Sequence, residues 1–178
     1  ISKLNVEIPP EEEFKKIAQI FKIYPNESKE NALVNYERGM LLYGLISKYK
    51  PKTILEIGRA QGYSTMCMAW ALCENKIDGK IISVDPLSYE NSIEWLIDWD
   101  GKIKTEKKST KQIWSKYAKS DWLEKIIPLT CFSDELLEKE DLPKFDFGFI
   151  DGHHLYEAVL CDFNIFLKNS NKKFHCLF

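Results

Sequence analysis

The chain has 178 residues, of which 44% are hydrophobic and 29% charged, so its composition is that of a globular protein rather than a collagen-like or wholly disordered one. Its 25 basic and 27 acidic side chains give a net charge of −2, which provides no overall positive field for nucleic acid or a membrane surface. No apolar run reaches the roughly 20 residues that span a bilayer. The start shows no signal-peptide pattern, and we expect a soluble, cytoplasmic protein.

The five cysteines include no C-x-x-C pair, and their number is odd. This pattern argues against a zinc knuckle and against a secreted disulfide framework. We expect buried, reduced thiols. The chain begins without Met and ends inside an apolar run, so we interpret both ends as cut.

Residues 1–50 are predicted to form helices that pack on a sheet. Apolar residues recur at helical spacing over residues 11–21, after an acidic first turn. Residues 24–28 break this pattern, and residues 29–48 resume it. Pro51 ends the second helix.

Short β-rich segments follow and alternate with helical ones. The predicted strands are residues 53–57, 81–84, 126–130, 145–150 and 174–178. A brief helix is expected between residues 132 and 142, and an amphipathic one over residues 156–166. Strands separated by helices form parallel sheets with right-handed crossovers. The predicted fold class is therefore α/β, a doubly wound, mostly parallel Rossmann-like sheet with helices on both faces.

The connection between the second and third strands is unusually long, about 40 residues. We predict a helical insertion at about residues 87–125, because Ile93, Leu96 and Ile97 recur at helical spacing. The Lys-rich residues 102–111 are predicted to be an exposed turn between two helical pieces. Whether this insertion forms a substrate lid is left open.

The turn after the first strand contains Gly58 and Gly62 in a G-x-x-x-G arrangement, which lacks the G-x-G-x-x-G of dinucleotide sites. Glu56 precedes the turn, and Asp85 ends the second strand at the position of a ribose-binding acid. A nucleoside with a positively charged appendage would satisfy both carboxylates. Arg59, within the turn, is expected to be exposed.

Three segments, ILEIGRAQGYST at 54–65, IISVDP at 81–86 and FDFGFIDGHHLYEAVLCDF at 145–163, carry a resemblance to a known family. They resemble class I S-adenosylmethionine-dependent methyltransferases, in particular the branch of small-molecule O-methyltransferases and cephalosporin hydroxylase-like enzymes. The resemblance extends from about residue 37 to the C-terminus. It implies a cofactor-binding methyltransferase domain at residues 51–178 that lacks its C-terminal strands.

The resemblance also implies a set of cofactor-binding residues: Glu56, Gly58, Gly62 and Ser64 for the methionine part of S-adenosylmethionine, Asp85 for the ribose, and Phe132 and Ser133 for the adenine. Alternative roles remain open. The glycines also suit a tight turn, and Ser133 also suits the N-cap of the next helix.

Asp151 and His154 follow the fourth strand and are the candidate catalytic residues. Methyl transfer needs a deprotonated acceptor atom, and either a histidine or a cation held by a carboxylate supports that deprotonation. The resemblance implies that Asp151 is a ligand of Mg²⁺ or another divalent cation. His153, however, stands where that branch more often has Asp, and its further acidic ligands would follow residue 178. Alternatively, Asp151 caps the next helix.

The predicted function is methyl transfer from S-adenosylmethionine to a small-molecule acceptor at a hydroxyl oxygen, with assistance by a divalent metal left open. One alternative is a non-catalytic binding or scaffold module of the same fold. A second alternative is a nicotinamide-dependent oxidoreductase. We expect neither nucleic acid nor a membrane as a partner, and a homodimer remains an option.

Overall fold

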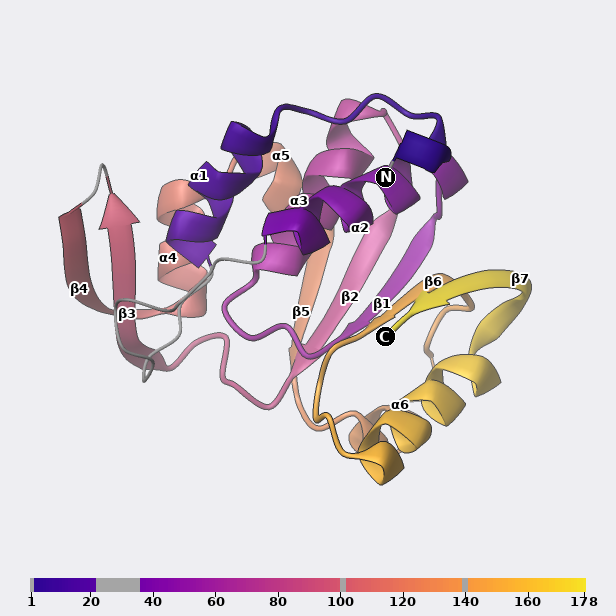
Figure 1. Cartoon of the computed structure of the whole chain (residues 1–178). Coiled ribbons are helices and arrows are strands. Elements are labelled where there is room, and N and C mark those ends of the chain that lie inside the picture. Colours follow the sequence, from indigo (N-terminus) through magenta and orange to yellow (C-terminus); the bar gives the residue numbers. More distant parts are fainter. Residues whose placement is uncertain (1, 22–35, 100–101, 139–140) are drawn as a thin grey trace.

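The computed structural model describes residues 2–21, 36–99, 102–138 and 141–178. Its centre is a five-stranded sheet in the order β5-β2-β1-β6-β7, in which each neighbouring pair is parallel (Figure 1). The strands are β1 (Thr53–Ile57), β2 (Lys80–Asp85), β5 (Ile126–Thr130), β6 (Phe145–Ile150) and β7 (Ser170–Leu177). The predicted strands and parallel sheet are confirmed, and β7 begins four residues earlier than predicted.

The central strands β1, β2 and β6 are mostly buried, because helices cover both faces of the sheet. On β1, Ile54 lies in one hydrophobic cluster and Leu55 in another, since successive side chains of a strand point to opposite faces. The first cluster includes buried side chains of α1 (Glu11–Phe21), α2 (Tyr36–Tyr49) and α3 (Tyr63–Glu74). The second includes buried side chains of α6 (Tyr156–Lys168). Figure 1 shows α1, α2 and α3 on one side of the sheet and α6 on the other. The doubly wound architecture is confirmed.

The remaining predicted helices agree in part. The brief helix after β5 is the 3₁₀ helix η2 (Asp134–Glu138), and another 3₁₀ helix, η1 (Ser2–Leu4), lies near the start. The predicted break at residues 24–28 and the first turns of the second helix, residues 29–35, lie outside the described residues. Within the parts of the chain that are described, no helix has the length and apolar character needed to cross a membrane.

The insertion contains a β-hairpin, so the prediction of helix around residues 93–97 and of a Lys-rich turn at 102–111 is wrong. β3 (Ser92–Trp99) pairs antiparallel with β4 (Lys102–Ser109) in a separate two-stranded sheet. Trp95 and Ile97 are 0% and 1% exposed, on the side of β3 that faces the core. Burial at every second residue is the period of a strand. Among the described residues of the insertion, the helical ones lie in α4 (Thr110–Tyr117) and α5 (Ser120–Leu123).

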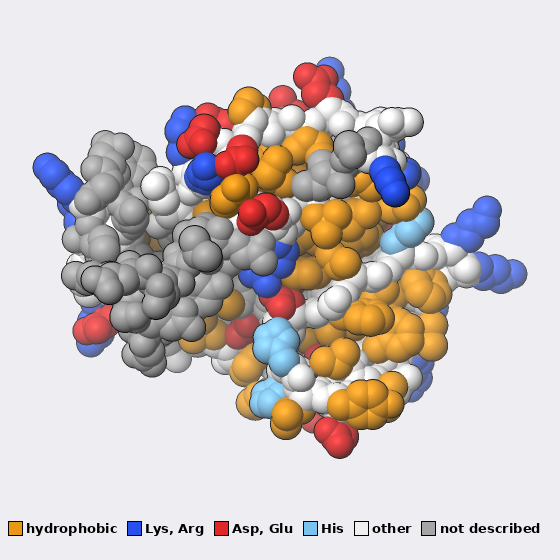
Figure 2. All heavy atoms as spheres, viewed as in Figure 1, with side chains coloured by type: hydrophobic (Ala, Val, Ile, Leu, Met, Phe, Trp, Pro, Cys, Tyr) orange, Lys and Arg blue, Asp and Glu red, His pale blue; other side chains and the backbone are white. Residues whose placement is uncertain are grey.

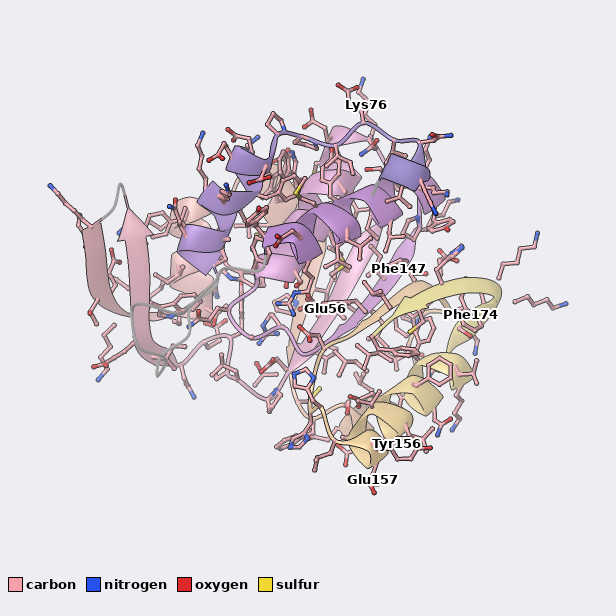
Figure 3. The ribbon with its side chains drawn as sticks, in the orientation of Figure 1. Glu56, Lys76, Phe147, Tyr156, Glu157 and Phe174 are labelled. Carbon is pink, nitrogen blue, oxygen red and sulfur yellow. The ribbon has the colours of Figure 1, made fainter. Side chains whose placement is uncertain are left out.

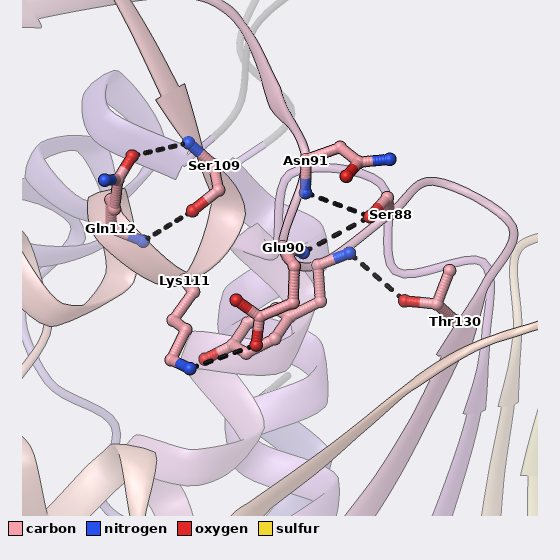
Figure 4. A network of polar contacts seen from close by, with 8 residues as sticks. Ser88, Glu90, Asn91, Ser109, Lys111, Gln112 and Thr130 are labelled. Carbon is pink, nitrogen blue, oxygen red and sulfur yellow. Dashed lines mark hydrogen bonds and ion pairs between the residues drawn. The ribbon is translucent and has the colours of Figure 1, made fainter.

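Polar contacts attach the base of the hairpin to the sheet (Figure 4). Ser109 and Gln112 form a reciprocal capping box at the start of α4. The amide N–H of Tyr89 donates to Oγ1 of Thr130 at the end of β5, at 3.1 Å. Capping and anchoring of this kind fix the direction in which α4 leaves the hairpin.

No disulfide links the five cysteines. Cys67 is fully buried, as expected, and burial raises the pKa of its thiol. Cys73, Cys131 and Cys176 are only partly buried and Cys161 is exposed, so the expectation of buried thiols is confirmed for Cys67 alone.

Candidate functional site

The carboxyl ends of β1 and β6 meet where the direction of winding reverses, which is where ligands bind in open α/β sheets. The amide N–H of Asp151 donates to the carbonyl of Ile57 at 2.8 Å, and that of Gly58 donates to the carbonyl of Val84 at 2.9 Å. Gly58 has a φ of +91°, and a Cβ atom there would collide with the carbonyl of Asp151. Glycine is therefore required for the turn to pass this close to the end of β6.

A strand-end cleft of about 580 Å³ opens beside this turn. Five of the predicted site residues line it: Gly58, Asp85, Phe132, Ser133 and Asp151. Val84, Pro86 and Cys131 add apolar surface. A mainly apolar cleft with a few polar groups at its edge is typical of a small-molecule site.

Asp85 links the two loops that border the strand-end cleft. Its Oδ2 accepts a hydrogen bond from the amide N–H of Ala60 at 2.8 Å, and its Oδ1 accepts one from that of Leu87 at 2.7 Å. Each carboxylate oxygen has two lone pairs, so both oxygens can accept a further bond from a ligand. Asp85 is thus held in place at the position expected of a ribose-binding acid.

A smaller turn hollow of about 110 Å³ is also lined by Gly58. Gly62 and Ser64 line it, as does Asp151, which also lines the strand-end cleft. Gly62 has a φ of +101° and lies against the indole of Trp114, whose Nε1–H donates to the carbonyl of Gln61 at 3.0 Å. The insertion therefore supports the glycine turn through α4, a role that the sequence did not predict for Trp114.

In the loop after β5, the side chain of Phe132 is exposed, whereas that of Ser133 is bonded to a neighbouring helix. The ring of Phe132 is 62% exposed, so it is available to pack against a ligand. The hydroxyl of Ser133 donates to Oδ1 of Asp162 on α6. Asp162 is only 4% exposed, and burial raises the pKa of its carboxyl group. Asp162 was not predicted, and it lines the same cleft.

Glu56 lies apart from both hollows. Its side chain is 0% exposed, on the side of β1 that faces α3 (Figure 3). Its Oε2 accepts hydrogen bonds from the hydroxyls of Thr65, at 2.7 Å, and Ser83, at 2.5 Å. Burial raises the pKa of Glu56 to about 7, although those two hydrogen bonds oppose the shift. The structure thus places this acid beneath the glycine turn.

Arg59 is buried, so the prediction that it is exposed is wrong. The residue is 2% exposed, and its guanidinium donates to the carbonyls of Ser83, Leu129 and Leu87 at 3.1, 3.2 and 2.7 Å. These carbonyls belong to β2, to β5 and to the loop after β2. Arg59 therefore anchors the turn to the ends of two neighbouring strands.

Asp151 forms an ion pair with Arg38 of α2, a partner that sequence reasoning missed. The alternative role of Asp151 as a helix cap is not observed, because α6 has Leu155 at its N-cap and no side-chain cap. His153 lines the strand-end cleft, whereas His154 is exposed and is not among the residues that line the cleft or the turn hollow. The structure therefore brings Asp151, but not His154, to the candidate site.

The described residues do not fit a divalent cation at Asp151. Across residues 2–21, 36–99, 102–138 and 141–178, no three or more His, Cys, Asp or Glu side chains are grouped so as to hold a metal ion. Mg²⁺ and Ca²⁺ take several oxygen ligands, and protein sites supply carboxylates for them. Here the Asp151 carboxylate is instead paired with the guanidinium of Arg38.

Comparisons with solved structures agree with the fold. The chain is similar to the O-methyltransferase TomG of Streptomyces achromogenes, in complex with SAM, with 20% identity, a TM-score of 0.60, and coverage of 96% of this chain and 66% of that one. It is similar to an O-methyltransferase of Bacillus cereus in complex with SAH, with 18% identity, a TM-score of 0.59, and coverage of 94% and 65%. It is also similar to the SAH-bound methyltransferase PaMTH1 of Podospora anserina, with 16% identity, a TM-score of 0.61, and coverage of 97% of this chain and 64% of that one.

The chain thus spans about two thirds of the length of these three proteins. No curated protein matches its sequence. A family model described as "Methyltransferase domain" matches residues 55–174, which include the glycine turn, Asp85 and Asp151. The chain therefore belongs to this methyltransferase family, in the class I group with the Rossmann-like sheet.

Proposed function

We propose that the chain binds S-adenosylmethionine in the strand-end cleft and the turn hollow, and transfers its methyl group to an oxygen of a small-molecule acceptor. One observation carries the proposal: the fixed carboxylate of Asp85 and the exposed ring of Phe132 border a single cleft beside the glycine turn. Similar proteins crystallised with SAM or SAH support it.

In this proposal, Asp85 accepts the ribose hydroxyls and Phe132 packs on the adenine, while Ser133 holds the loop through Asp162. Gly58, Gly62 and Ser64 border the methionine part, because they line the turn hollow. The cofactor, when bound, supplies a methyl group on a positively charged sulfur.

Two of the predicted residues take modified roles in the proposal. Glu56 makes no contact with the cofactor in the proposal and supports the turn from behind through its bonds to Thr65 and Ser83, because its side chain is fully buried. His153 replaces His154 as the titratable group beside the cleft, because His153 lines it. A cytoplasmic location and a homodimer are also part of the proposal.

Calorimetric titration with S-adenosylhomocysteine tests cofactor binding. The wild type should bind, and Asp85→Asn should weaken binding about ten- to a hundredfold, the value of one to two hydrogen bonds to a charged group. Asp78→Asn makes the same change at an exposed position before β2, at the opposite end of the sheet, and should leave the affinity unchanged. A folded wild type that does not bind would contradict the proposal.

Turnover separates the enzyme from its alternatives. Release of S-adenosylhomocysteine in the presence of hydroxylated and carboxylated acceptors would establish catalysis. Binding without turnover for any acceptor would favour the binding module. Tight binding of NADH in a fluorescence titration would favour the oxidoreductase.

A further inference from the structure

Ser133 and Asp162 form a polar pair in the wall of the strand-end cleft. Both residues line the cleft, Ser133 from the loop after β5 and Asp162 from α6. The hydroxyl of Ser133 donates to Oδ1 of Asp162. The other oxygen, Oδ2, lies next to Gly152 in the turn after β6, because a Cβ atom on Gly152 would be 3.3 Å from it. The carboxylate is therefore held between two segments that line the cleft.

The direction of the hydrogen bond limits which groups the pair can bind. A serine hydroxyl has one proton and two lone pairs, and it rotates to suit its neighbours. The proton of Ser133 is given to a carboxylate, so its oxygen can only accept a bond from a molecule in the cleft. Within the described residues, no second donor is bonded to Asp162. The pair therefore presents acceptors to the cleft.

The charges that line the strand-end cleft favour a ligand with hydrogen-bond donors. In the described part of the chain, no Lys or Arg lines this cleft. Its acidic lining residues are Asp85, Asp134, Asp151 and Asp162. Figure 2 shows acidic side chains and histidines close together on one face of the molecule, beside α6. Carboxylates accept hydrogen bonds and attract positive charge, so the cleft suits a ligand that carries N–H groups.

Phe132 connects the pair to the base of the cofactor. Its exposed ring directly precedes Ser133 in the same loop. In the proposed function the adenine packs on this ring, which brings the edge of the base to the neighbouring Ser133. Adenine has an amino group at its 6-position, and that group is a donor. Hypoxanthine, the base of inosine, has a carbonyl oxygen at the same position, and that oxygen is an acceptor.

We infer that the Ser133–Asp162 pair selects a cofactor whose base is a 6-aminopurine over one whose base is a 6-oxopurine. The inference rests on the proposed function and names the group through which the base is recognised. The Ser133 oxygen accepts a hydrogen bond from the 6-amino group. Asp162 is a positioning residue, which keeps the hydroxyl proton turned away from the base. A 6-oxo group would set its lone pairs against those of Ser133, and a site that binds a donor rejects an analogue without one.

Calorimetric titration with two probes tests the selection. S-adenosylhomocysteine carries the 6-amino group, and S-inosylhomocysteine carries the 6-oxo group on an otherwise similar molecule. The wild type should bind the adenosine form at least about tenfold more tightly, the value of one hydrogen bond. Equal binding of the two forms would overturn the inference. Folded wild type that binds neither form would instead contradict the proposed function, so the two failures are distinguishable.

The variant Asp162→Ala separates a positioning role from a structural one. Without the carboxylate, the Ser133 hydroxyl can turn its proton towards a 6-oxo group, because a free hydroxyl donates as readily as it accepts. The ratio of the two affinities should therefore fall close to one. A merely structural role for Asp162 would weaken both forms by the same factor and leave the ratio unchanged. An unchanged ratio in folded Asp162→Ala would overturn the role of Asp162.

Variants of the loop after β5 provide the matched controls. Ser133→Thr retains a hydroxyl and should keep the preference for the adenosine form, whereas Ser133→Ala should reduce it by weakening that form. Asp134→Asn removes an exposed carboxylate from the same cleft and should leave the preference unchanged. A preference that is lost in Asp134→Asn and kept in Asp162→Ala would assign recognition of the base to Asp134 and overturn the inference.

Discussion

Glu56 should make the stability of the protein fall as the pH rises. Its carboxyl group has an ordinary pKa of 4.5 when unfolded and a pKa of about 7 when buried in the fold. Between these two values the folded chain holds a proton that the unfolded chain has released, so raising the pH favours unfolding. Above pH 7 the penalty is complete and stays constant.

The size of the effect follows from the two pKa values. Each pKa unit corresponds to about 1.4 kcal/mol, so the difference amounts to about 3 kcal/mol of unfolding free energy. Because Glu56 is 0% exposed, solvent does not screen this penalty. The variant Glu56→Gln cannot ionise, and its stability should lack this component. The amide nitrogen replaces Oε1, which has no hydrogen-bond partner, at a cost of about 1 to 3 kcal/mol that is the same at each pH.

Urea unfolding at several pH values between 4.5 and 8 measures the effect. The stability of the wild type minus that of Glu56→Gln should fall by about 3 kcal/mol across this range. Glu74→Gln, at an exposed position at the end of α3, makes the same chemical change and corrects for the general loss of a carboxylate. A difference between wild type and Glu56→Gln that stays constant with pH would refute the buried, protonated state of Glu56.

Substitutions at three further positions test the framework of the site. Gly58→Ala should destabilise the fold by about 2 to 4 kcal/mol, because alanine is strained at positive φ and its Cβ meets the Asp151 carbonyl; a loss below about 1 kcal/mol in urea unfolding would contradict this. Trp114→Phe should lower the unfolding free energy by about 1 kcal/mol, because the hydrogen bond to the Gln61 carbonyl is lost. Trp114→Ala should lower it by about 3 to 5 kcal/mol, because the whole ring is lost. Similar melting curves for the two variants would show that the ring does not support the turn. Ser133→Ala removes the hydroxyl that donates to buried Asp162, and it should destabilise the fold by about 1 to 3 kcal/mol. The loss of stability should be larger at pH 8 than at pH 5, because the lost hydrogen bond favours the ionised form of the Asp162 carboxyl group. A loss of stability that does not depend on pH would contradict this role of Ser133.

The strands and the strand-end residues were predictable because their signals are local. The run from Thr53 to Gly62 combines a buried strand with a glycine turn, and Asp85 ends a second such strand. In a parallel sheet these ends share one edge, so their proximity follows from the fold class alone. The hairpin had a local signal too: Ile93, Trp95 and Ile97 alternate, and an Asp-Gly pair, which is common in hairpin turns, follows them.

The pairings across the fold were not predictable in the same way. Arg38 meets Asp151 because α2 packs beside the end of β6, and nothing near either residue in the sequence indicates the other. Arg59 was expected in solvent because buried arginines are rare. Its burial depends on carbonyls of strand ends and loops that only the assembled sheet brings within reach.

The position of Trp114 on the glycine turn makes the protein suitable for label-free NMR. Indole N–H signals are resolved in a spectral region of their own, and the Trp114 N–H donates directly to a carbonyl of the turn. The Trp95 N–H donates instead to the carbonyl of Lys108, within the hairpin. One indole therefore serves as a reporter of what enters the turn hollow, and the other as an internal reference in the same spectrum.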